Sequence, residues 1–235
     1  MSSPDDTVAP AQPERRLEAD DSLRPSGLDL PTAAVFLAAG RAFAELVAAV
    51  PADAWDRPAL GEWDVRALVG HAGRGLTTLV DYLGRPSDEA AEVADAAAYF
   101  ARGSRLAAEG DLNEVVRQRG IAAGAALGAD PAATVRGWLD DARAALASVT
   151  GDPVIPTALG RMRVSAYLPT RSFELTTHSV DLAVAVGLPA ELPEATLLEA
   201  VGIAAAVGVL AGHGPTLLLA LTGRRGLPAG FSVVP

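Results

Sequence analysis

Apolar residues recur at steps of three and four along most of the chain, the spacing of an α-helix that faces a core. The first such pattern begins at Pro31 and stops at Pro51. A second follows Asp64, which stands where an N-cap residue belongs, and ends at Gly84. The pattern therefore predicts two long helices joined by a loop.

The second half of the chain continues the helical pattern. Pro131 suits the first turn of a helix, and the stretch from Thr150 to Gly160 predicts a loop or short hairpin. A further helix, with a kink expected near Pro169, ends at Gly187. Two more helices and an extended end complete an all-α bundle of four principal helices with accessory C-terminal ones. Sites in such folds are usually built from side chains on facing helices.

Composition shifts divide the chain into three parts. Residues 1–28 are polar and proline-spotted, lack the apolar core of a secretion signal, and are predicted to be a disordered tail. Residues 29–190 form the helical bundle, and residues 191–235 form C-terminal helices and an extended tail packed on it. The apolar stretch from Ala200 to Leu221 is broken by glycines and a proline, which favours two core helices over a membrane span. We expect a cytoplasmic protein without a membrane partner.

Composition also excludes several classes of function. The net charge is −10, and the arginines are scattered without a basic stripe, so nucleic acid is not an expected partner. The chain has no cysteine, which excludes disulfides, cysteine-ligated zinc, iron–sulfur clusters and a catalytic thiol. It also has no lysine, which excludes a Schiff base. A metal here must be bound by His, Asp or Glu.

The most informative stretch lies on the predicted helix that ends at Gly187. Arg171, Glu174, His178 and Asp181 are separated by three, four and three residues, so they share one stripe of that helix. A charged stripe is usually a solvated face, or an ion network without a ligand. Because apolar residues occupy the other sides, we interpret this helix as buried nearly all round. A buried carboxylate and imidazole must then be paired or must bind a metal.

His71, on the second predicted helix, is the third candidate ligand. It is flanked by Gly70, Gly73 and Gly75, which would let another helix or a ligand approach closely. His213 stands at a helix break and is left out of the site. His71, Glu174 and His178 together make a set that holds zinc or another divalent metal with one position open, which is typical of catalytic sites. Arg171 or Asp181 could orient these ligands.

Two segments of the chain resemble a known family. Trp63-Asp-Val-Arg-Ala-Leu-Val-Gly-His71 is similar to the tryptophan-to-histidine signature of the mycothiol-dependent maleylpyruvate isomerase family, and the stretch from Arg171 to Asp181 is similar to its Arg-x-x-Glu-x-x-x-His-x-x-Asp signature. The resemblance spans roughly Pro31 to Pro189. It implies a DinB-like four-helix bundle in which His71, Glu174 and His178 bind zinc. The isomerase itself carries a further α/β domain after the bundle, whereas about 45 residues follow Pro189 here. We therefore do not expect maleylpyruvate to be the substrate.

The leading functional hypothesis is a zinc-dependent, mycothiol-dependent transferase or isomerase. In it the metal activates a low-molecular-weight thiol toward a small electrophilic substrate, and Arg171 or Arg74 holds an anionic group. The first alternative is a zinc hydrolase that uses metal-bound water, with Asp181 or a nearby carboxylate as base. The second is a non-catalytic metal-binding or sensing module. A Ser-His-Asp triad is not expected, because no Gly-x-Ser-x-Gly elbow is present. The sequence allows a monomer or a homodimer.

Overall fold

The computed structural model describes residues 31–110 and 112–234, and the predicted tail 1–28 lies outside them. Helices account for most of the described chain, which confirms the predicted all-α class. Short strands form two antiparallel hairpins, β1–β2 and β3–β4. In chain order the elements are α1 (Pro31–Ala48), β1 (Pro58–Leu60), β2 (Trp63–Asp64), α2 (Val65–Leu83), α3 (Ala96–Glu109), α4 (Leu112–Ala126), α5 (Pro131–Ser148), β3 (Val154–Thr157), β4 (Gly160–Arg163), α6 (Val164–Val186), α7 (Glu194–Leu210) and α8 (Gly214–Leu221).

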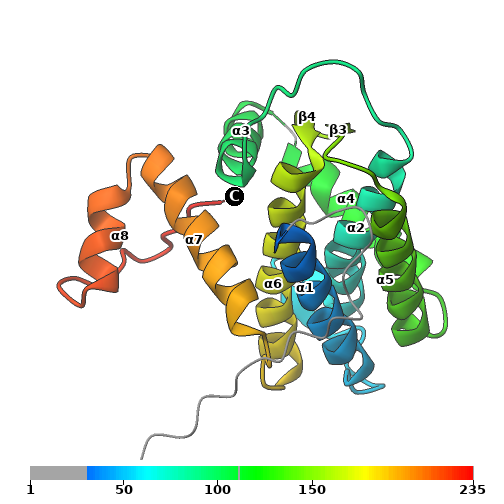
Figure 1. Cartoon of the computed structure of the whole chain (residues 1–235). Coiled ribbons are helices and arrows are strands. Elements are labelled where there is room, and N and C mark those ends of the chain that lie inside the picture. The colour runs from blue at the N-terminus through cyan, green and yellow to red at the C-terminus, as the bar shows by residue number, and fades with distance from the viewer. Residues whose placement is uncertain (1–30, 111, 235) are drawn as a thin grey trace, which may run out of the picture.

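Four helices, α1, α2, α5 and α6, form the central bundle (Figure 1). Each of α1 and α2 packs against both α5 and α6, and α4 lies along the other side of α2. Phe36, Phe43, Leu76 and Leu175 are fully buried in the core of this bundle. The bundle therefore places α2 and α6, which carry the candidate ligands, in direct contact.

Local signals set the helix ends where the sequence predicts them. The Ala67 amide donates a 2.7 Å hydrogen bond to the Asp64 carboxylate, which caps α2. Asp130 caps α5 in the same way, with Pro131 in the first turn. Gly187 ends α6 with a φ of 71°, a left-handed conformation that glycine adopts without strain.

Glycines on α2 allow its neighbours to approach closely, as the sequence suggests. A Cβ atom at Gly70 would lie 2.2 Å from the backbone nitrogen of Gly124 on α4. A Cβ atom at Gly73 would lie 2.5 Å from the Trp138 ring on α5. These contacts hold α2 firmly, and with it His71.

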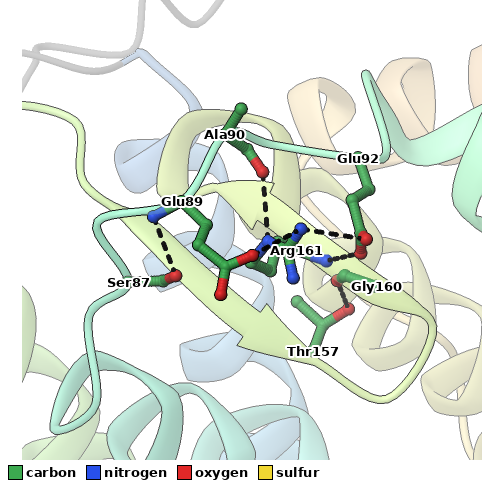
Figure 2. Close-up of polar contacts among 7 residues, drawn as sticks. All are labelled: Ser87, Glu89, Ala90, Glu92, Thr157, Gly160 and Arg161. Atoms are coloured by element: carbon green, nitrogen blue, oxygen red, sulfur yellow. Dashed lines mark hydrogen bonds and ion pairs between the residues drawn. The ribbon is translucent and has the colours of Figure 1, made fainter.

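The β3–β4 hairpin leads directly into α6 and is fastened by Arg161 (Figure 2). The Arg161 guanidinium lies 3.0 Å from the Glu92 carboxylate and 3.1 Å from the Glu89 carboxylate. It also donates a 3.1 Å hydrogen bond to the carbonyl oxygen of Ala90. This cluster joins the hairpin to the segment between α2 and α3, and so fixes where α6 begins.

Two expectations about burial are wrong. One face of the last turns of α6 is exposed, since Val184 is 78% and Val180 is 40% exposed, so this part of the helix is not buried all round. The C-terminal pair is not formed by two core helices. α7 packs against α6 and α3, but α8 packs on α7 and has no buried residue (Figure 1).

In the described part of the chain, one helix, α1, is long and apolar enough to span a membrane. Its Phe36, Phe43 and Val47 side chains are buried in the bundle core. A core helix of a soluble protein has the same length and composition, so α1 is accounted for by its place in the fold.

Candidate metal centre

His71 on α2 and Glu174 and His178 on α6 meet at one point. One Glu174 carboxylate oxygen lies 3.4 Å from His71 Nε2 and 3.3 Å from His178 Nε2. The three ligand atoms lie within 4.8 Å of one another. In a tetrahedral zinc site with bonds of about 2.0–2.1 Å, neighbouring ligand atoms are roughly 3.3 Å apart. The spacing of these donors fits a single small divalent cation.

Asp181 sets the protonation pattern that a metal needs. Its carboxylate lies 2.9 Å from His178 Nδ1, one turn further along α6. A carboxylate at that distance accepts a hydrogen bond from Nδ1–H, so Nε2 is the nitrogen that faces Glu174 and that would bind a metal once it has lost its proton. The structure thus brings Asp181 to the ligand set in the orienting position that the sequence suggests.

The charges of the metal-free site compensate one another. Burial lowers the pKa of His178, but hydrogen bonds with Asp181 and Glu174 outweigh burial and raise it to about 9. Burial raises the pKa of Glu174, yet hydrogen bonds from His178 and His71 hold it well below its usual value. Burial lowers the pKa of His71. A cation bound between the three residues would replace the proton that His178 otherwise carries.

His71 is held by packing. Its ring lies 4.5 Å from the Trp63 ring and makes an edge contact with the His178 ring at 4.9 Å. Trp63 in turn donates a 3.1 Å hydrogen bond to the carbonyl oxygen of Arg117. Among the described residues, the buried Nδ1 atom of His71 has no hydrogen-bond partner. Its orientation therefore depends on aromatic contacts and on Glu174, whereas His178 is also held by Asp181.

Arg171 lies one turn before Glu174, and its guanidinium is surrounded by aromatic rings. Its central carbon lies 4.9 Å from the Tyr167 ring centre and 5.6 Å from that of Tyr99, distances typical of cation–π contacts. Arg171 Nε also donates a 2.9 Å hydrogen bond to the Thr170 hydroxyl. No carboxylate in residues 31–110 and 112–234 forms a salt bridge with it. Arg171 is thus available to a negatively charged ligand.

A cavity of about 320 Å³ joins the ligand set to Arg171. Three arginines, Arg74, Arg119 and Arg171, line it, while Glu174 is its one lining carboxylate among the described residues. In a chain with a net charge of −10, this local excess of positive charge favours an anionic ligand. The flat walls of the cavity come from Trp63, Tyr82, Tyr99, Phe100, Tyr167 and Phe173.

The sequence does not predict the aromatic walls. Tyr99 and Phe100 come from α3, which is far from both signatures along the chain. The lining tyrosine Tyr167 is also hydrogen-bonded, with its hydroxyl 3.3 Å from that of Thr78. No local spacing links these residues, so only the packing of α3 against α6 shows that they belong to one cavity.

A family model matches the chain over residues 36–183 and is described as the mycothiol maleylpyruvate isomerase N-terminal domain. The match covers more than half of the chain. The chain belongs to this family. The resemblance of the two signatures is thereby confirmed, and the all-α bundle is of the DinB-like type. No curated protein and no solved structure matched the chain.

The residues matched by the family model extend from the first turns of α1 to near the end of α6 and include all three candidate ligands. The α7 and α8 helices lie beyond them. Membership associates the bundle with mycothiol chemistry, and the structure supplies a His₂Glu cluster that could hold a metal ion.

Proposed function

We propose that this protein is a zinc-dependent, mycothiol-dependent enzyme of the transferase or isomerase type. The observation that carries the proposal is the convergence of His71, Glu174 and His178 in the wall of a cavity. Zinc, or another divalent metal, would be held by these three residues. A bound divalent cation supplies a Lewis acid that lowers the pKa of a thiol and so provides a thiolate at neutral pH.

The protein's own residues have separate roles in this proposal. Asp181 accepts a hydrogen bond from Nδ1–H of His178 and so leaves Nε2 of that ring as the nitrogen that binds the metal. Trp63 holds the ring of His71 in place. Arg171 binds an anionic group of the electrophile, and the surrounding rings exclude water and strengthen that charge interaction. The partners of the site are therefore a low-molecular-weight thiol and a small electrophilic molecule. We place the reaction in the cytoplasm, where such thiols are reduced.

The hydrolase alternative has less support. A hydrolase needs a carboxylate or imidazole free to accept a proton from water. Asp181 is engaged with His178, and the one carboxylate found in the described lining, Glu174, belongs to the ligand set. A sensing module is the remaining alternative. Tight metal binding without thiol affinity would favour it.

Thiol consumption by the zinc-loaded protein tests the proposal. The assay uses mycothiol with a panel of electrophiles that includes chlorodinitrobenzene and maleylpyruvate, and the control is the Glu174→Gln protein. We expect consumption that needs both zinc and Glu174. Hydrolysis of esters without added thiol would support the hydrolase instead, and no reaction with any electrophile would contradict an enzyme of this type.

A further inference from the structure

The helices α7 and α8, with the segment that follows them, expose many large apolar side chains. Eight large apolar side chains between Glu194 and Leu227 are each between 39% and 70% exposed. They are Leu197, Leu198, Val201, Val209, Leu210, Leu218, Leu221 and Leu227. Monomeric soluble proteins rarely leave such side chains gathered on one pair of helices unless a partner covers them.

These residues follow a helical repeat. On α7, the buried positions Thr196, Ala200 and Val207 face the bundle. Leu198, Val201 and Val209 are spaced three and eight residues apart, so they share the opposite face of α7. These three side chains form an exposed apolar stripe from Leu198 to Val209 on α7.

The neighbouring helix α8 is even more exposed. Its sequence from Gly214 to Leu221 contains four leucines, yet none of its residues is buried. It lies on the far side of α7 from the bundle (Figure 1). An isolated helix of eight residues is not stable in water, so packing must hold it. Even in the folded chain, Leu218 is 65% and Leu221 is 70% exposed.

We propose that the α7–α8 face, defined by Leu198, Val201, Val209, Leu218 and Leu221, is the interface between two copies of this chain. The two helix hairpins would pack about a two-fold axis as a four-helix bundle, in which each copy contributes the same surface. This inference is independent of the metal centre, whose ligands lie on α2 and α6.

Charge argues for a second copy as the partner. The chain has a net charge of −10, so two copies repel each other over most of their surface. The segment from Ala200 to Leu221 carries no Asp, Glu, Arg or Lys, so repulsion is least there. Of the charged residues of the hairpin, Glu194 begins α7 and Arg224 follows α8. Glu199 lies within α7 but hydrogen-bonds with Ser172 of α6, so it faces the bundle. An apolar centre with a polar rim is the ordinary layout of a protein interface.

The same charge pattern argues against a membrane surface. Helices that lie on membranes carry lysine and arginine on their polar face, which bind anionic lipid headgroups. Neither α7 nor α8 contains a basic residue. The acidic net charge of the chain would also repel an anionic bilayer.

The exposed apolar side chains would supply about half of a standard protein interface. Complete burial of a Leu or Val side chain removes roughly 60–120 Å² of apolar surface from water, so the eight partly exposed side chains offer on the order of 400–500 Å² per copy. The alanines and glycines between them add backbone and methyl surface. A standard interface covers about 800 Å² per partner, so the polar rim of the face would have to supply the rest.

The molar mass of the full chain in solution tests the interface. Light scattering after gel filtration, at micromolar concentration, is expected to give twice the 24.0 kDa of one chain. The Leu218→Glu, Leu221→Glu double variant is expected to have the mass of one chain while retaining helical content and zinc stoichiometry. Val115→Glu, at an exposed apolar position on α4, is the matched control and should remain a dimer.

Crosslinking provides a second test that does not depend on the folding of the double variant. Because the chain has no cysteine, Leu221→Cys introduces a single thiol. A short bis-maleimide should join two Leu221→Cys chains and leave Val115→Cys chains unjoined. A wild-type chain that stays monomeric up to about 100 μM, or binds phosphatidylcholine vesicles as a monomer, would overturn the proposal. Equal crosslinking at the two positions would overturn it as well.

Discussion

The ligand-bearing stretch of α6 and the α7–α8 face depart in opposite directions from the usual distribution of residues in a soluble protein. In α6, a carboxylate and an imidazole at Glu174 and His178 lie in largely buried surroundings. In α7 and α8, leucines and valines face solvent. Buried polar groups and exposed apolar groups both have a cost unless something compensates them. Around Glu174 the compensation comes from His71, His178 and Asp181, a set that we propose to hold a cation. On the α7–α8 face the described residues supply none, and there we propose a second chain.

The two regions also differ in how firmly they are built. The α6 stripe is supported by α2, whose glycines let the α4 backbone and the Trp138 ring of α5 approach closely, and by hydrogen bonds such as that between His178 and Asp181. The outer face of α8 has no such support. Substitutions should therefore have large effects around the ligand set and small ones on the α7–α8 face of the isolated chain.

The largest effect is expected from removing a ligand. His178→Ala should lower the affinity for zinc by more than about 100-fold, since even residues that only orient metal ligands contribute about 10–100-fold. Calorimetric titration with zinc measures the change. His213→Ala is the control, because its ring packs against Phe231 outside the cluster. An equal loss of zinc affinity in both variants would contradict the assignment of His178 as a zinc ligand.

Next in size is the effect of filling the contact between α2 and α4. Gly70→Ala should lower the free energy of unfolding by about 3 kcal/mol or more, because the new Cβ atom would meet backbone atoms of α4 that cannot move independently. Denaturation in urea measures it. Gly137→Ala on α5 is the matched control, since nothing lies within 4 Å of its added Cβ atom, and it should stabilise the chain by about 0.5–1 kcal/mol. A loss of stability in Gly137→Ala as large as that in Gly70→Ala would show that the close contact between α2 and α4 is not what makes Gly70 necessary.

A smaller effect is expected at the orienting carboxylate. Asp181→Asn should weaken zinc binding by about 10–100-fold and leave the stoichiometry unchanged, because the amide no longer fixes the Nδ1–H form of His178. Competition with a chromogenic chelator gives the affinity. Asp140→Asn, at an exposed ion pair with Arg143, should bind zinc as the wild type does. If Asp181→Asn bound zinc as tightly as the wild type, the contact between Asp181 and His178 would not contribute to metal binding.

The smallest effect is expected on the α7–α8 face. In dilute solution, where single chains predominate, Leu221→Ala should change the free energy of unfolding by no more than about 0.5 kcal/mol. The difference from wild type should grow as the protein concentration rises, because only the dimer buries this side chain. Thermal melts at two concentrations measure it. A concentration-independent loss of about 2–5 kcal/mol, as for a buried leucine, would show that Leu221 belongs to the core of a single chain.

The parts of the molecule that the sequence predicts are those with a local signal. Asp64 and Gly187 mark helix ends because capping depends on neighbouring residues. Glu174 and His178 share a stripe because they are one turn apart, and the chain's few histidines leave little choice for the third ligand. The same reasoning fails where partners are distant. Tyr99 joins the cavity only through the packing of α3, and hydropathy cannot distinguish a helix buried in its own chain from one such as α8 that stays exposed.

Cobalt(II) substitution followed by thiol titration tests whether a metal at His71, Glu174 and His178 binds a thiol, because cobalt reports both coordination geometry and sulfur ligation in its absorption spectrum. We expect one cobalt per chain with a tetrahedral spectrum. We also expect a sulfur-to-cobalt charge-transfer band that appears on addition of mycothiol and is absent in Glu174→Gln. A protein that binds no cobalt, or binds it without a spectral response to thiol, would contradict the proposed thiol chemistry.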